Sequence, residues 1–70
     1  MTISEKIRLL LLRRNTTITA LAVKMGISRQ YLSKKLKNND FSVSDLSKIA
    51  TALNCRFDSV FTMNDTGEKI

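Results

Sequence analysis

The stretch from residue 29 to residue 37 concentrates side chains that could bind phosphates and read base edges. Its donors are Arg29, Gln30, Ser33, Lys34 and Lys37. On a helical wheel, Leu32 and Leu36 mark the inward side, and the polar and basic side chains lie opposite them or flank that side, as Tyr31 does. Arg and Lys can donate to guanine, Gln can pair with an adenine edge, and neighbouring cations can meet phosphates. This face suits a helix in the major groove of DNA, although lysines that only keep a small bundle soluble would form a similar face.

Positive charge is concentrated in the same part of the chain. The 70 residues include 12 Lys and Arg against 6 Asp and Glu, for a net charge of +6. Between Lys6 and Asn39 there are nine basic residues and no acidic one. A field of one sign attracts polyanions such as nucleic acid or anionic lipid, whereas a charge run that only solvates a helix usually mixes both signs. The distribution therefore favours a polyanionic partner.

The residue types that the chain lacks exclude several kinds of site. With no His and a single Cys55, the sequence offers no metal-ligand cluster, no His-based catalysis and no internal disulfide. We therefore expect no enzyme, no metal and no cofactor, and we expect Cys55 to be a small buried residue. An apolar run such as Leu9 to Leu12 is far shorter than the roughly 20 residues that span a bilayer, and the first residues form no basic leader. The expectation is a cytoplasmic, nucleoid-associated protein with no membrane partner and no evident small-molecule ligand.

Capping residues divide the first part of the chain into three helices. Thr2 and Glu5 have the spacing of a capping box, which predicts a helix from residue 3 to residue 14 or 15. Thr17 is the best N-cap for a short helix that ends at Met25, and Gly26 can close that helix in the left-handed conformation. Ser28 can then cap the helix over 29–37. The residues expected to face the core of the first two helices are Ile3, Ile7, Leu10, Leu11, Ile18, Leu21, Ala22 and Met25.

A turn over 38–40 separates these helices from the last part of the chain. Ser42 and Asp45 have the spacing of a second capping box, and the helix that follows buries apolar residues at helical spacing and stops near Asn54. These residues are Leu46, Ile49, Ala50 and Leu53. Phe57, Val60 and Phe61 favour a further short helix, yet Phe57, Ser59, Phe61 and Met63 also fit a strand by alternation. One domain over 1–63 is predicted, followed by a flexible C-terminal tail over 64–70.

At this point the sequence resembles the lambda-repressor and Cro-like (XRE-type) family of helix-turn-helix DNA-binding proteins. The resemblance covers about residues 5 to 61. Leu21-Ala22, then Met25-Gly26-Ile27-Ser28-Arg29, and Leu32 stand where the family has its Leu-Ala pair, its apolar-Gly-apolar-Ser-Arg turn and its recognition-helix anchor. The segment from Leu46 to Asn54 looks like the fourth helix of the family. The resemblance implies an all-α fold, a compact four- or five-helix lambda-repressor-like bundle.

The resemblance also implies which residues contact DNA. The positions that match the base-facing ones of the family are Arg29, Gln30, Ser33 and Lys34. The regions through which the family contacts phosphates correspond to Thr17, Thr19, Lys37, Asn38 and Asn39. Beyond the resemblance, Ser28, Tyr31 and Lys35 are further candidates for contact with the DNA backbone. Backbone donors at helix N-termini supply the physical reason for phosphate contacts there. Ile18 replaces a frequent Gln of the family and is expected to pack inward, while Tyr31 could either pack against the start of the preceding helix or contact DNA.

The predicted function is that of a sequence-specific regulator of transcription that binds double-stranded DNA. The expected form is a homodimer that represses by occupying a palindromic operator, with its two reading helices roughly 34 Å apart, one helical turn of DNA. The alternative is an adaptor or antitoxin-like module that uses the same bundle to bind an acidic protein without reading DNA, since fold alone does not fix function.

Overall fold

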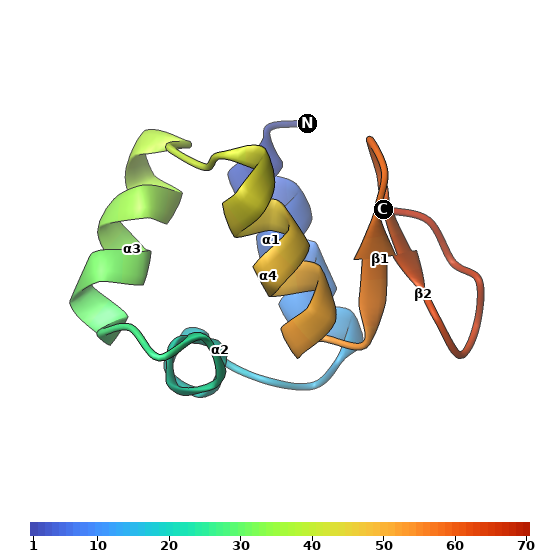
Figure 1. Ribbon diagram of the computed structural model, residues 1–70, viewed down its shortest axis with the longest axis horizontal. Helices are drawn as coiled ribbons and strands as arrows, with labels where there is room; N and C mark the ends of the chain where they lie inside the picture. The colour runs from blue at the N-terminus through green and yellow to red at the C-terminus, as the bar shows by residue number, and fades with distance from the viewer.

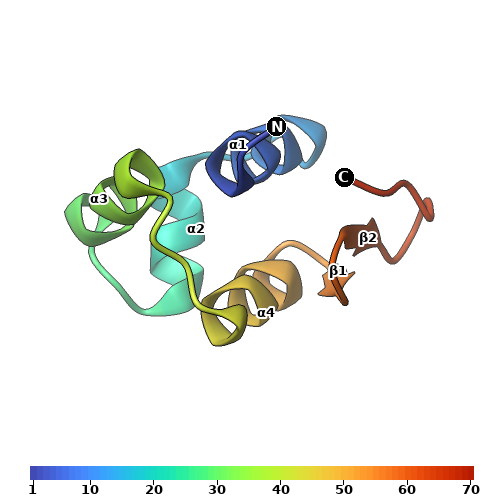
Figure 2. The ribbon, with the colours of Figure 1, turned by 90° about the horizontal axis from the view of Figure 1, so that it is seen from above.

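Four helices and a two-stranded antiparallel sheet follow one another along the chain in the computed structural model, which describes residues 1–70 (Figure 1). They are α1 (Ile3–Arg13), α2 (Ile18–Met25), α3 (Arg29–Asn38), α4 (Val43–Ala52), β1 (Cys55–Phe57) and β2 (Phe61–Met63). α3 and the β1–β2 hairpin lie at opposite ends of the long axis of the molecule, with α1 and α4 between them (Figures 1 and 2). This arrangement leaves one side of α3 without a neighbouring element.

The predicted capping residues begin the helices as expected. The hydroxyl groups of Thr2, Thr17, Ser28 and Ser42 each accept a hydrogen bond from the backbone N–H three residues later. Reciprocal capping boxes form at Thr2 with Glu5 and at Ser42 with Asp45. Gly26 closes α2 in the left-handed region, with φ of 71°, where glycine carries no steric penalty. The sequence therefore encodes the helix boundaries to within one or two residues.

The core is a single apolar cluster to which all four helices and the hairpin contribute. Its fully buried side chains include Ile7, Leu21, Leu32, Ile49 and Phe61. Side chains of this kind each contribute about 1.5–3 kcal/mol through removal of apolar surface from water. Ile18 packs against the cluster, as expected for the residue that replaces a polar one, and Cys55 is a free, buried thiol. The inward side predicted for every helix is confirmed.

The further helix predicted near residues 57–61 is wrong, and the description all-α needs a corresponding correction. β1 and β2 form an antiparallel pair in which Cys55 lies opposite Met63 and Phe57 lies opposite Phe61. Cys55, Phe57, Phe61 and Met63 pack in or against the core, which matches the period of two that also fitted this stretch, and Thr62 between them is buried as well. The connecting turn places Ser59 at φ of 99°, a conformation that a right-handed helix does not contain.

The last seven residues return along β2. Phe61 and Ile70 exchange two backbone hydrogen bonds of 3.1 and 2.9 Å, and the N–H of Met63 donates to the carbonyl oxygen of Glu68 at 2.9 Å. Two ion pairs join this segment to the end of α1, between Arg13 and Glu68 and between Arg14 and Asp65. These contacts hold residues 64–70 against β2 and the end of α1. The predicted flexibility of this segment stays a prediction.

Arg14 also joins the end of α1 to the end of α4. Its guanidinium donates to the carbonyl oxygens of Leu53 and Asn54, both at 2.8 Å, and so satisfies acceptors that α4 leaves free at its C-terminus. Hydrogen bonding to Asp65 raises the pKa of this guanidinium. None of the four helices combines the length and apolar composition that a bilayer crossing requires.

Candidate nucleic-acid interface

The outward side of α3 presents the predicted reading residues to solvent. Leu32 and Leu36 are buried beneath the helix, whereas Arg29, Gln30 and Lys34 are exposed on its other side. Ser33, the fourth candidate for base contact, is only half-exposed and lies at the edge of this surface. The structure therefore gives the four predicted side chains unequal access to a partner.

Three cations on or beside this face are not neutralised within the chain. Arg29, Lys34 and Lys37 form no ion pair. The three ion pairs of the molecule involve Arg13, Arg14 and Lys35. Their side chains also make no hydrogen bond to the protein. Unpaired guanidinium and ammonium groups on one helix face can bind phosphates or base acceptors without first breaking an internal contact.

Lys35 lies in a different environment from its neighbours. Its ammonium Nζ is 3.1 Å from Oδ2 of Asp45, 3.3 Å from the carbonyl oxygen of Asp40 and 5.2 Å from the centre of the Tyr31 ring. Hydrogen bonding to Asp45 raises the pKa of Lys35. The Asp45 carboxylate also accepts from the N–H of Ser42, and this backbone bond is the largest cause of its lowered pKa. Lys35, predicted to contact the DNA backbone, thus joins α3 to the start of α4.

Tyr31 and Asn38 line a small depression along one side of α3. The depression has a volume of about 150 Å³, and its lining residues are Tyr31, Lys34, Lys35, Asn38 and Asp40. Tyr31 is 51% exposed and carries the Lys35 ammonium over its ring. Four of the predicted DNA-contacting residues are brought together here, at the turn between α3 and α4.

Asn39 has one half of its side-chain amide already engaged. It caps α3 in the left-handed conformation, with φ of 50°, and its Oδ1 accepts a hydrogen bond of 3.1 Å from the N–H of Ser4. Only the NH₂ donors of the amide remain for a phosphate. Asn38, which is exposed and makes no side-chain hydrogen bond, retains its full donor capacity.

The predicted contacts at the start of α2 consist of hydroxyl groups. Thr17 and Thr19 are both exposed, and Oγ1 of Thr17 accepts from the N–H of Ala20 at 3.1 Å. Ser28 accepts in the same way from the N–H of Tyr31 at the start of α3. A hydroxyl that accepts through one lone pair keeps its proton, so Thr17 and Ser28 can still donate to a phosphate oxygen.

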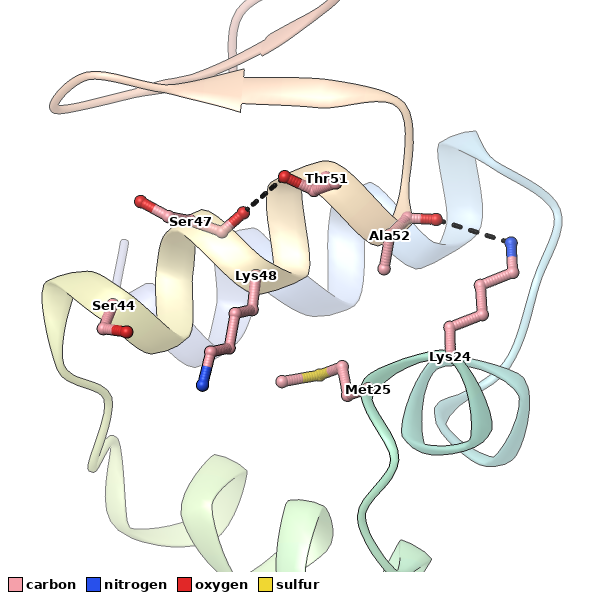
Figure 3. A pocket seen from close by; sticks show the side chains of 7 residues that line it. All are labelled: Lys24, Met25, Ser44, Ser47, Lys48, Thr51 and Ala52. Atoms are coloured by element: carbon pink, nitrogen blue, oxygen red, sulfur yellow. Dashed lines mark hydrogen bonds between the residues drawn. The ribbon is translucent and has the colours of Figure 1, made fainter.

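Sequence reasoning missed Ser4 and the largest hollow of the surface. Ser4 is buried, and its hydroxyl donates to the carbonyl oxygen of Leu36. The hollow, about 430 Å³ in volume, lies between α2 and α4 and contains none of the predicted site residues (Figure 3). Its lining residues are Lys24, Met25, Ser44, Ser47, Lys48, Thr51 and Ala52. This hollow could have been expected from the sequence, because polar residues spaced three or four apart share one face of α4. These residues are Ser44, Ser47, Lys48 and Thr51.

Comparison with known families agrees with this geometry. The sequence model of the Cro/C1-type HTH DNA-binding domain matches residues 6–66 of the 70-residue chain. No curated protein and no solved structure matches the chain. The matched region includes all of α2, α3 and α4, the hairpin and most of α1, so it contains every residue of the candidate interface. The chain therefore belongs to the family of Cro/C1-type HTH DNA-binding domains.

Proposed function

We propose that the protein is a sequence-specific regulator of transcription that binds double-stranded DNA through the outward side of α3. The observation that carries this proposal is the group of three unpaired cations, Arg29, Lys34 and Lys37, beside the exposed amide of Gln30. Gln30 and Lys34 read bases, with Arg29 as a second donor to guanine and Ser33 at the margin. No side chain on this face needs to leave an internal partner before it contacts DNA.

The phosphate contacts of the proposal flank this reading face on two sides. Thr17, Thr19 and Ser28 supply hydroxyl donors near the start of α2 and of α3. Lys37, Asn38 and the free NH₂ of Asn39 supply donors at the C-terminal end of α3, and Tyr31 supplies a hydroxyl beside the small depression. Such contacts fix orientation and register on the duplex, while base contacts supply the sequence preference. Lys35 contributes mainly by holding α3 against α4, since its ammonium is bound to Asp45.

The proposed assembly is a homodimer on a palindromic operator, and the proposed effect is repression by occupying promoter DNA. Two copies related by a twofold axis would place their α3 helices about 34 Å apart, one turn of the double helix, so that both enter the major groove on one side of the DNA. A chain of this size buries a modest fraction of its surface, and a dimer contact would add to its stability.

The first test measures affinity for a duplex of random sequence at low salt by fluorescence anisotropy. The wild-type protein is expected to bind, and Lys37→Ala is expected to weaken binding several-fold because one phosphate-attracting charge is lost from α3. Lys48→Ala is the matched control, because it removes the same charge from an exposed position on α4 that lies outside the proposed interface. Negligible wild-type affinity would contradict the proposal and favour the adaptor function, as would equal losses for the two variants.

A further inference from the structure

The C-terminal end of α3 is held by a contact that lies outside the reading face. Ser4, in the first turn of α1, is 5% exposed and is the one buried polar residue of the four helices. Its hydroxyl donates to the carbonyl oxygen of Leu36, and its N–H donates to Oδ1 of Asn39 at 3.1 Å. One residue of α1 thus binds both the last turn of α3 and the residue that caps it, across more than 30 positions of sequence.

The conformation of Asn39 explains how it can serve both helices. Asn adopts the left-handed region more readily than other residues with a side chain, and a φ of 50° lets Asn39 end α3. Its side-chain oxygen then reaches the start of α1, where the first N–H groups have no partner within the helix. Glycine at position 39 would allow the same backbone conformation but could not accept the hydrogen bond from Ser4.

The other end of α3 is fixed by the turn after α2. Gly26 closes α2, and Ser28 caps α3 through the N–H of Tyr31 at 3.1 Å. The turn joins the N-terminal end of α3 directly to α2, against which α3 packs, and the C-terminal end is bound to α1 through Ser4. A helix that is held at both ends presents its outward residues at a fixed angle, and small errors in such positioning are costly for groups that must meet base edges.

We propose that Ser4 and Asn39 are positioning residues for DNA reading, which hold α3 at the angle that base contact requires. This inference rests on the proposed function of α3. It assigns Ser4, which lies on a different helix and outside the exposed surface, a role in sequence discrimination. It also gives Asn39 a role that is separate from any phosphate contact of its NH₂ group.

The first part of the test uses the free protein and needs no DNA ligand. NMR residual dipolar couplings give the orientation of α3 relative to α1, and amide hydrogen exchange gives the protection of the Ser4 N–H. In Asn39→Gly the Ser4 N–H is expected to exchange faster, and in both Asn39→Gly and Ser4→Ala the couplings of α3 are expected to depart from the wild-type orientation. Wild-type couplings in both variants would overturn the positioning role, whether or not the protein reads DNA.

The second part compares affinity for a duplex recovered by selection from random DNA with affinity for an unselected duplex. Ser4→Ala is expected to lower affinity for the selected duplex about tenfold, the effect of a helix that holds the reading orientation in roughly one molecule in ten, and to leave the unselected duplex nearly unchanged. Asn38→Ala is the control, because it removes a neighbouring exposed amide and is expected to weaken both complexes equally.

All measurements are made at a temperature where circular dichroism shows every variant fully folded. An unchanged ratio of the two affinities for Ser4→Ala would overturn the inference, and a selection that recovers no preferred duplex would overturn the proposed function instead.

Discussion

The four basic residues of α3 have the same charge but different surroundings. Lys34 and Lys37 are exposed and free of ion pairs, and Arg29 shares both properties at the start of the helix. Lys35 is bound to Asp45 and covers Tyr31. At the residue scale, Arg29, Lys34 and Lys37 are therefore available to a ligand, whereas the neighbouring Lys35 stabilises the protein.

This division predicts two kinds of binding defect. Gln30→Ala and Lys34→Ala should change which duplex is preferred, because these side chains are placed to meet base edges. Lys37→Ala should weaken binding to all sequences and lower the slope of log affinity against log salt concentration by about one, because it removes a phosphate contact. Affinities for a selected and a random duplex over a range of salt concentrations separate the two kinds. Equal losses on both duplexes for Gln30→Ala and Lys34→Ala would remove direct base reading from this account.

The Asp45 carboxylate makes folding sensitive to acid. Hydrogen bonds from the Ser42 N–H and from Lys35 lower its pKa, and the carboxyl pKa of Glu5 and Asp65 is lowered as well. The folded protein thus binds fewer protons than the unfolded chain, so this contribution to the unfolding free energy is complete above the ordinary carboxyl pKa of about 4 and is lost as pH falls through the lowered values. Urea denaturation between pH 7 and pH 2.5 measures the loss.

A variant pair assigns part of that acid sensitivity to Asp45. Asp45→Asn should be less stable than wild type at pH 7 and should lose less stability on acidification. Asp58→Asn should follow the wild-type profile, because the Asp58 carboxylate makes no hydrogen bond in the structure. Parallel profiles for Asp45→Asn and wild type would show that the contact with Lys35 and Ser42 does not contribute.

At the scale of elements, the hairpin is part of the core. Phe61 is fully buried and packs against Phe57 with ring centres 4.9 Å apart, while Phe57 is half-buried. Both side chains come from strands of three residues, which would be too short to be stable without the helices beneath them. The hairpin and the helices therefore depend on one another.

We expect Phe61→Ala to destabilise the protein by about 3–5 kcal/mol, the usual cost of deleting a buried aromatic ring, which is a large fraction of the stability of a domain this small. Phe57→Ala should cost less, because its ring is partly exposed already. The midpoints of urea denaturation give both values. Equal and small losses for the two variants would mean that the hairpin is not part of the cooperative unit.

Much of the element structure could be predicted because its determinants are local. Thr17, Gly26, Ser28 and Ser42 specify helix ends through contacts within three or four residues, and the spacing of apolar residues specifies the buried sides. The hairpin could not be decided in the same way, because Phe57 and Phe61 fit both periods and the choice depends on packing against α4 and α1. The role of Ser4 was hidden for a similar reason, since its partners are distant in sequence.

The candidate site shows the same limit. The exposed positions of Gln30 and Lys34 follow from the wheel position of Leu32, but the ion pair of Lys35 with Asp45 depends on how the turn over 39–42 brings α4 beside α3. A sequence pattern can indicate which side of a helix faces outward. It cannot indicate which cation is already neutralised by an acid from another element.

At the scale of the whole molecule, the candidate interface and the hairpin lie at opposite ends. The molecule extends 30 × 21 × 19 Å along its principal axes, and α3 lies at one end of the longest axis (Figure 1). The acidic tail residues Asp65 and Glu68 form ion pairs with Arg13 and Arg14 at the end of α1. Arg29, Lys34 and Lys37 remain unpaired at the opposite end of the molecule, where their positive charge favours approach of a polyanion to α3.

The central claim is that α3 reads a DNA sequence, and selection from a pool of random double-stranded DNA tests it most directly. After several rounds at physiological salt, the account predicts enrichment of one motif, arranged as an inverted repeat whose half-sites are about one helical turn apart, as expected for a twofold dimer. The double variant Gln30→Ala with Lys34→Ala, selected in parallel, should lose or change that motif. Recovery of no motif, or of the same motif with the double variant, would contradict reading by α3, while a single unrepeated half-site would contradict the dimer.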